Sequence, residues 1–388
     1  MNNLCTDIGY HSLFKHHEEL CGDHIEVVEQ QENSSVIVLA DGLGSGVKAN
    51  ILATLTSKIL STMVSNNIPM EECVETIVQT LPVCKERGVA YSTFSAIHIN
   101  NDGKGYMFEF DNPVCIFMSN GVPKELEREE LNILNKKIYK TKLDLKDQDV
   151  IILMSDGVPH AGIGKTLNLG WQREDIIDYL VKNTSTDMSA RCIANVLASA
   201  SEALYMEEPG DDTTVAAIKI RKESTVNIMI GPPVKREDCD RYVEDFLRND
   251  GIRIVCGGTT SQIVANYLHE EVETDINYID QEIPPIGYIK GIDLTTEGVL
   301  TLRKLIELSE EYLRIDSDYP KNFLGKDGAS QLANFLFEQA TDVNFFVGQA
   351  VNEAHSGLPI DSTLKFKLVE KLSENLKSMG KRINVKYY

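Results

Sequence analysis

Apolar and polar residues alternate along the chain in two distinct ways. Over the first 220 residues, short apolar runs bounded by Gly, Asn, Asp and Ser predict strands, and apolar residues spaced three or four apart predict helices. The predicted strands are 25–28, 36–40, 94–99, 106–110, 114–118, 150–154 and 214–220, and the predicted helices are 47–64, 74–81, 176–181 and 193–204. Because the helices come in blocks around the strands, the pattern favours an α+β sandwich over strict βαβ alternation.

The pattern changes after the short charged segment Arg221–Ser224. Strands and helices then alternate, which is typical of a mostly parallel sheet. The predicted strands are 226–230, 252–255, 343–347 and 383–385, and the predicted helices are 242–247, a segment starting at 263, and 364–376. We therefore expect two domains, residues 1–222 and a smaller α/β domain over residues 223–388.

The composition limits the kinds of partner that the chain is expected to bind. The chain has 388 residues, and its formal net charge of -21 disfavours binding to nucleic acid or to an anionic membrane. No apolar run approaches the ~20 residues of a membrane span, and the first residues do not form a signal peptide. The cysteines are scattered without a CxxC pair, which suits a reducing compartment. We expect a cytoplasmic protein with no nucleic-acid or membrane partner.

Three acidic positions stand where predicted strands end or begin. Of five Asp-Gly pairs, Asp41-Gly42 and Asp156-Gly157 each follow a five-residue apolar run, while Asp211 precedes the strand 214–220. Turn and cap residues would explain any one of them. Carboxylates that meet at one sheet edge repel unless cations lie among them, and oxygen ligands favour Mg²⁺ or Mn²⁺. Gly42 would let its backbone carbonyl approach such an ion.

Four motifs carry a family resemblance. ADGLGSG, YSTFSAIHI, IILMSDGV and GDDTTVAAI occur in this order over residues about 20–220. The set resembles the metal-dependent type 2C protein serine/threonine phosphatases, and most of all their bacterial SpoIIE-type branch. The resemblance implies an αββα sandwich with two Mn²⁺ or Mg²⁺ ions, a water activated by both ions, and a phosphoprotein substrate.

The same resemblance assigns roles to individual residues. Asp41 would bridge both ions and Gly42 would offer its carbonyl to the second. Asp156 and Asp211 would bind the first ion, and Asp23 would hold a water bound to it. Asp212 and Thr214 would contact these ligands without binding an ion themselves.

The chain also departs from the family pattern. Leu43 stands where eukaryotic members have a histidine that is a proposed general acid, and no nearby arginine matches their phosphate anchor. The resemblance then implies that water protonates the leaving group and that the metals hold the phosphate. The helix after Gly46 matches the helix pair that regulates metal occupancy in this branch.

Other polar residues have simpler explanations. His11, His16, His17, Cys21 and His24 form a tempting zinc cluster, but no second Cys/His pair accompanies them, which favours solvated loop residues. The segment 164–166 lacks the earlier glycine of a phosphate-binding P-loop. The glycine-rich tract 157–170 suits a loop beside the metal cleft. Its histidine at position 160 is more simply a loop residue than a substrate contact.

Glycines also follow the predicted strands of the second domain. Carboxyl ends of parallel strands share one edge, where ligands of such folds bind. Gly257, Gly258, Thr259 and Thr260 open a helix there, and either a small anionic ligand or a plain strand-to-helix turn explains them. Two functions stay open for the whole chain, namely a phosphatase regulated or targeted by residues 223–388, and a non-catalytic phosphatase-like regulator. The oligomeric state is open, a homodimer included.

Overall fold

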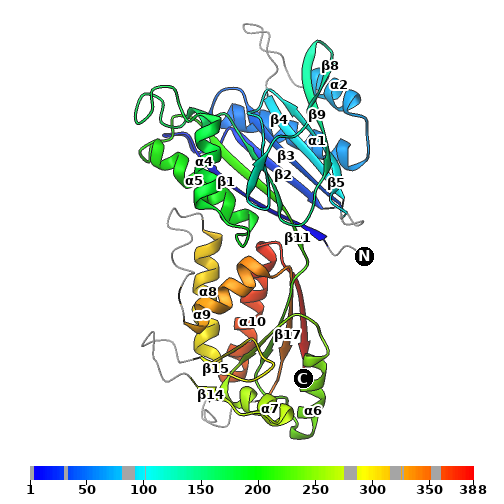
Figure 1. Ribbon diagram of the computed structural model, residues 1–388, viewed down its shortest axis with the longest axis vertical. Helices are drawn as coiled ribbons and strands as arrows, with labels where there is room; N and C mark the ends of the chain where they lie inside the picture. Colours follow the sequence, from blue (N-terminus) through cyan, green and yellow to red (C-terminus); the bar gives the residue numbers. More distant parts are fainter. Residues whose placement is uncertain are drawn as a thin grey trace. The chain divides into compact units, whose positions relative to one another are not determined.

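The computed structural model describes residues 4–29, 34–80, 92–100, 102–274, 286–314, 325, 327–350 and 360–388. The chain forms two compact units, Met1–Lys222 and Glu223–Tyr388 (Figure 1). The boundary lies inside the charged segment that separates the two hydrophobic patterns.

Two antiparallel sheets build the N-terminal unit. The five-stranded sheet has the order β1-β11-β10-β6-β7, and the six-stranded sheet has the order β2-β3-β4-β5-β9-β8. Their strands are β1 (Leu4–Leu13), β2 (Asp23–Glu29), β3 (Ser34–Gly42), β4 (Ser92–Asn100), β5 (Lys104–Phe110), β6 (Ile116–Ser119), β7 (Val122–Lys124), β8 (Glu129–Ile133), β9 (Lys136–Asp144), β10 (Asp149–Met154) and β11 (Thr213–Lys222).

Helices cover the outer face of each sheet. α1 and α2 pack on the six-stranded sheet, and α4 and α5 pack on the five-stranded sheet (Figure 1). The helices are α1 (Gly46–Ser65), α2 (Met70–Thr80), α3 (Gly157–His160), α4 (Arg173–Asn183) and α5 (Ala190–Leu204). A third apolar cluster fills the space between the two sheets. The four layers confirm the predicted αββα sandwich.

The continuous apolar runs follow from burial on both faces of a strand. On β3, Val36 and Val38 face the helices, whereas Ile37 and Leu39 face the other sheet. Neither face meets water, so polar residues do not alternate with apolar ones. β10 is buried in the same way. Both strands are therefore stiff supports for the aspartates near their ends.

Some expectations for this unit were incomplete or wrong. β1, β7, β8, β9 and α3 were not predicted. His11 is not a solvated loop residue, because it lies buried on β1 with its Nδ1 2.9 Å from Asn195 Oδ1. His16 and His17 are exposed, as expected for loop residues. The expected end of the second helix at residue 81 falls outside the described residues.

The C-terminal unit is built on one mixed sheet with the order β14-β15-β16-β13-β12-β17-β18. β16, β13, β12, β17 and β18 are parallel neighbours, while β14 and β15 add antiparallel edge strands. The strands are β12 (Thr225–Ile230), β13 (Ile252–Cys256), β14 (Glu273–Thr274), β15 (Gly287–Tyr288), β16 (Leu294–Thr296), β17 (Asp342–Val347) and β18 (Arg382–Tyr387). The expectation of a mostly parallel sheet is confirmed.

Helices lie on both faces of this sheet. α6 and α7 pack on one face, and α8, α9 and α10 pack on the other. Their bounds are η1 (Arg236–Asp238), α6 (Cys239–Leu247), α7 (Gly258–Leu268), α8 (Val299–Leu313), α9 (Gly328–Ala333), the π-helical turn η3 (Asn334–Gln339) and α10 (Ile360–Ser378). Asp327 caps α9 by accepting a hydrogen bond from the Ser330 amide. Among the described helices of the whole chain, none is long and apolar enough to cross a bilayer.

Candidate metal centre

Aspartates from both sheets of the N-terminal unit meet at one edge of the sandwich. Asp23 and Asp41 are direct partners across β2 and β3. Asp156 and Asp211 flank the paired ends of β10 and β11, where Met154 is opposite Val215. The negative charges of Asp23, Asp156, Asp211 and Asp212 all act on Asp41. The structure therefore brings together the three aspartates on which the sequence hypothesis rests, with Asp23 beside them.

Ser155 links the two sheets at this edge. Its hydroxyl donates a 2.7 Å hydrogen bond to Asp23 Oδ2 and accepts one from the Thr214 amide at 2.8 Å. Its own amide donates to the Thr214 carbonyl at 2.9 Å. The side chain is fully buried. Ser155 therefore holds the Asp23 carboxylate of the six-stranded sheet against the ends of β10 and β11.

Burial and mutual repulsion disturb the acidity of these carboxyls. Burial and, after it, the charges of the neighbouring carboxylates together raise the pKa of Asp41 to about 9. Burial likewise raises the pKa of Asp23 to about 7, although hydrogen bonds from Ser155 and Thr214 oppose this. Burial also raises the pKa of Asp212. A divalent cation would favour the ionised forms, so its binding would release protons from this edge.

The outer part of the cluster includes two basic side chains. Lys15 Nζ lies 3.7 Å from Asp211 Oδ1, and the Lys15 amide donates to Asp212 Oδ1 at 3.1 Å. His160 Nδ1 lies 3.8 Å from Asp156 Oδ2. Burial raises the pKa of Asp156, the charge of His160 lowers it, and Asp211 raises it again. The cluster is therefore acidic overall, with Lys15 beside Asp211 and His160 beside Asp156.

Gly42 is needed for packing. A Cβ atom at this position would lie 2.1 Å from the backbone oxygen of Ala49 in α1. The glycine therefore lets α1 approach the end of β3. From the sequence, this glycine had been explained by the approach of an ion to its carbonyl. Gly157 is crowded in the same way by the backbone oxygen of Asp212, 2.2 Å from the ideal Cβ.

The residues present fit a site for hard divalent cations. Asp23 Oδ1 is buried and has no hydrogen-bond partner among the described residues, so this carboxylate oxygen is left unsatisfied. The aspartates offer oxygen donors alone, which Mg²⁺ and Mn²⁺ prefer. Asp156, His160 and Asp211 bring one ligand atom each to within 4.8 Å of one another. None of the N-terminal histidines and cysteines that were considered as zinc ligands belongs to this group.

Sequence reasoning did not assign Lys15 or Ser155 a role and treated His160 as a plain loop residue. Lys15 carries no local signal, because its partners are about 200 positions away in the sequence. Ser155 stands directly before Asp156, and its hydroxyl is the one feature that could have drawn notice. His160 follows Asp156 by four positions, the spacing of one helical turn, but the turn is too short to show periodicity.

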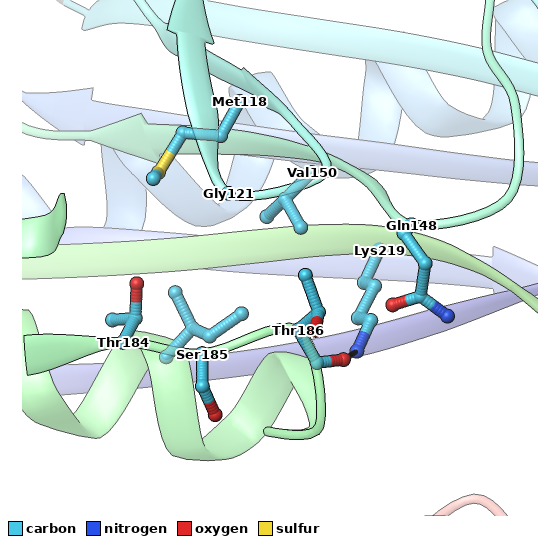
Figure 2. Close-up of a pocket in the computed structure, with 9 residues that line it drawn as sticks. Met118, Gly121, Gln148, Val150, Thr184, Ser185, Thr186 and Lys219 are labelled. Atoms are coloured by element: carbon cyan, nitrogen blue, oxygen red, sulfur yellow. Dashed lines mark hydrogen bonds between the residues drawn. The ribbon is translucent and has the colours of Figure 1, made fainter.

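A separate pocket of this unit lies at the far end of β10 and β11. It is lined by Met118, Gly121, Gln148, Val150, Thr184, Ser185, Thr186, Ile193 and Lys219. Figure 2 shows the Lys219 amine directed at the loop that carries Thr186. This amine donates to the carbonyls of Thr186 and Met188 at 2.6 and 2.8 Å. Lys219 thus fastens the loop between α4 and α5, and the pocket takes no part in the acidic centre.

The candidate ligand residues of the C-terminal unit lie at the start of α7. Gly257 has a φ of +109° and its amide donates to the Thr296 carbonyl at 2.8 Å. Gly258 and Thr259 are exposed, whereas Thr260 is buried. A Cβ at Gly258 would meet nothing within 4 Å, so space is open there. However, the carboxylate of Glu297 at the same edge accepts the Leu300 amide, and its charge does not favour an anion.

Residues 31–221 match the family model of Stage II sporulation protein E, SpoIIE. No curated protein matches the chain. Among solved structures, the chain is similar to the phosphatase domain of SpoIIE from Bacillus subtilis, with 18% identity over 58% of this chain and 96% of that one and a TM-score of 0.45. A second SpoIIE structure, its PP2C phosphatase domain with a fragment of the regulatory domain, shows 19% identity over 57% and 64% of the two chains and a TM-score of 0.49. RsbX in complex with magnesium shows 18% identity over 55% and 95% and a TM-score of 0.39.

Proposed function

Because residues 31–221 form a domain of the SpoIIE family, a PP2C-type phosphatase family, we propose that the chain is a metal-dependent phosphoprotein phosphatase. Its substrates would be phosphoserine and phosphothreonine in proteins. The observation that carries this proposal is the meeting of Asp23, Asp41, Asp156 and Asp211 at one edge of the sandwich. That edge combines a rigid scaffold, concentrated negative charge and an unsatisfied carboxylate oxygen.

Each aspartate has a role in this proposal. Asp41 would contact two Mn²⁺ or Mg²⁺ ions together with the Gly42 carbonyl, Asp156 and Asp211 would hold the first ion, and Asp23 would hold a water on it. When bound, the pair of ions supplies a water of lowered pKa and neutralises charge at phosphorus. The chain itself positions the carboxylates and excludes bulk water from Asp23. Asp41, whose pKa in the metal-free protein is raised to about 9, would give up its proton when it binds an ion.

Hydrolysis of an aryl phosphate and of a phosphoserine peptide, each with and without Mn²⁺, tests the proposal. Asp41→Ala, Asp156→Ala and Asp211→Ala should each lower kcat/KM by at least about 100-fold, as removal of a key electrostatic group does. Asp102→Ala is the matched control, because it changes an exposed aspartate of another Asp-Gly pair. If all four variants hydrolyse phosphopeptide as fast as the wild type, the phosphatase proposal is wrong.

The competing function is a phosphatase-like domain that signals by binding and does not hydrolyse. Leu43 is the observation that favours it, since the proposed general acid of eukaryotic members is missing there. The same assay separates the two functions. A wild-type protein that binds Mn²⁺ and a phosphopeptide but releases no phosphate would support the binding function.

We further propose that residues 223–388 regulate the phosphatase or select its target. The doubly wound sheet supports a ligand site, since such sheets bind ligands outside the carboxyl ends of their strands, and the start of α7 is open at Gly258. Thermal shift of the full chain with inorganic phosphate and with nucleotides tests this. Stabilisation of the wild type that Gly258→Asp abolishes would support an anion site. Equal responses of both proteins would reject one at Gly257–Thr260.

A further inference from the structure

His160 lies against the outer carboxylates of the acidic cluster. Its ring nitrogen and one oxygen each of Asp156 and Asp211 all lie within 4.8 Å of one another. We propose that His160 is a nitrogen ligand of the ion held by Asp156 and Asp211, and that it shifts the preference of this site from Mg²⁺ toward a first-row transition ion. The inference rests on the proposed metal-dependent function and adds a ligand that the family resemblance does not assign.

The backbone of α3 fixes the position of His160 over Asp156. The His160 amide donates to the Asp156 carbonyl at 3.0 Å, which closes one helical turn. Side chains four residues apart on such a turn lie on the same face. The imidazole is therefore placed beside the carboxylate by local geometry, before any ion is considered.

Contacts from outside hold the turn in place. The Tyr205 hydroxyl donates to the Gly157 carbonyl at 2.7 Å, and the Trp171 amide donates to the Pro159 carbonyl at 2.8 Å. Val158 is fully buried in the core under α4 and α5. Because the turn is anchored at both ends, it loses little conformational entropy when its side chain binds an ion.

The distances suit two ligands of one ion. An ion 2.0–2.2 Å from each ligand, as is usual for zinc and magnesium, allows a separation of up to about 4.2 Å between two ligand atoms. Asp156 Oδ2 and His160 Nδ1 are 3.8 Å apart. The side chain of His160 is half exposed, so the ring can turn either nitrogen toward the cluster.

The chemistry of the donor decides the preference. Mg²⁺ takes oxygen ligands almost exclusively, whereas imidazole suits transition ions. A centre of aspartates alone would discriminate little against Mg²⁺. One imidazole in the set gives a transition ion an interaction that Mg²⁺ gains only weakly.

Metal binding to the full chain tests the inference without a phosphatase substrate. Metal-free wild type, His160→Ala and His160→Glu are titrated with Mn²⁺, free Mn²⁺ is followed by electron paramagnetic resonance, and Mg²⁺ affinity is measured by competition. His269→Asn is the matched control, since His269 is exposed in the other unit and asparagine tolerates its left-handed backbone. Circular dichroism checks the fold of each variant.

We expect His160→Ala to weaken Mn²⁺ binding about tenfold or more, in line with the loss of a group that tunes a metal site, and to change Mg²⁺ affinity much less. His160→Glu should recover binding but lose the preference for Mn²⁺. Nitrogen hyperfine coupling to bound Mn²⁺ should occur in the wild type and vanish in His160→Ala.

Two results would overturn the inference. Bound Mn²⁺ without nitrogen coupling in the wild type would show that His160 is no ligand, and this holds even if the alanine variant fails to fold. Equal or tighter Mn²⁺ binding in His160→Ala would show an imidazolium that merely neutralises Asp156. Either result leaves the phosphatase proposal standing, whereas a wild type that binds no Mn²⁺ would overturn both.

Discussion

Asp41→Asn should stabilise the metal-free protein, although it removes the central ligand. The carboxyl of Asp41 has an ordinary pKa of 3.8 and a pKa of about 9 in the folded protein. At pH 7 the unfolded chain ionises this group, while the folded protein keeps it protonated. Folding therefore binds a proton at a pH well above the ordinary pKa of this group, which costs free energy. Asparagine removes that cost.

The magnitude follows from the pKa difference. Between 3.8 and pH 7 lie about 3.2 units, and each unit corresponds to 1.36 kcal/mol, so the cost is about 4 kcal/mol at most. Any folded pKa above 7 gives the same figure at this pH. The asparagine amide, buried among carboxylates, itself costs about 1–3 kcal/mol, which offsets part of this gain. We expect a net gain near 2 kcal/mol, or about 4–8 °C in Tm for a unit of this size.

The sign depends on pH and on metal. Because the folded pKa of Asp41 is raised, the metal-free wild type has its full stability below pH 4 and loses it as the pH rises toward 9. The advantage of Asp41→Asn should therefore vanish at pH 4 and grow above it. Excess Mn²⁺ should reverse the order, since an ion at 100 times its Kd adds about 2.7 kcal/mol to the wild type alone.

Thermal unfolding in EDTA and in Mn²⁺, from pH 4 to 9, measures all of these effects. Asp102→Asn serves as the control, because its carboxylate is exposed and lies in a hairpin turn. If Asp41→Asn is less stable than the wild type in EDTA by an amount that does not change with pH, the pKa of Asp41 is not raised in the folded protein and the electrostatic reasoning fails.

Three further predictions concern the supports of the centre. Gly42→Ala should lower the free energy of unfolding by at least about 2 kcal/mol in chemical denaturation, because its Cβ meets the Ala49 backbone in α1. The new Cβ of Gly44→Ala meets nothing, so this variant should lose only about 1 kcal/mol for its φ of +109°. Equal losses would contradict the packing argument. Ser155→Ala removes the Ser155 donor to Asp23 Oδ2 and should cost about 1–3 kcal/mol while weakening Mn²⁺ binding. Unchanged affinity by calorimetry would exclude a positioning role for Ser155. Ile37→Ala, in the core between the sheets, should cost about 2–5 kcal/mol in urea unfolding, against less than about 0.5 kcal/mol for the exposed Val122→Ala.

The sandwich was predictable because its central strands are buried on both faces. β3 and β10 read as unbroken apolar runs, and such runs end where the chain leaves the core. A polar residue at that point emerges at the sheet edge, so the positions of Asp41 and Asp156 follow from the runs. The family resemblance then supplied the αββα layering, which periodicity alone does not contain.

Other elements lack a readable pattern for physical reasons. β1 lies at the edge of its sheet, where most positions are half-buried, and its sequence LCTDIGYHSL mixes apolar and polar residues on both faces. Its pairing with β11 joins Leu4 to Lys222, a contact that no local rule contains. α3 spans a single turn, so the placement of His160 over Asp156 could be seen only once the turn was folded.

The acidic centre works against the stability of the fold, and the structure shows what offsets it. The ends of β3 and β10 belong to different sheets, which are pressed together by the apolar cluster that contains Ile37 and Ile151. That cluster fixes the separation of the carboxylates, so repulsion cannot relax by moving the strands apart. The strain must then be relieved locally, by protonation of Asp41 or by a bound cation. Metal occupancy and pH are for this reason two controls on one equilibrium, and a measurement of stability against either one at a fixed value of the other should report the same site.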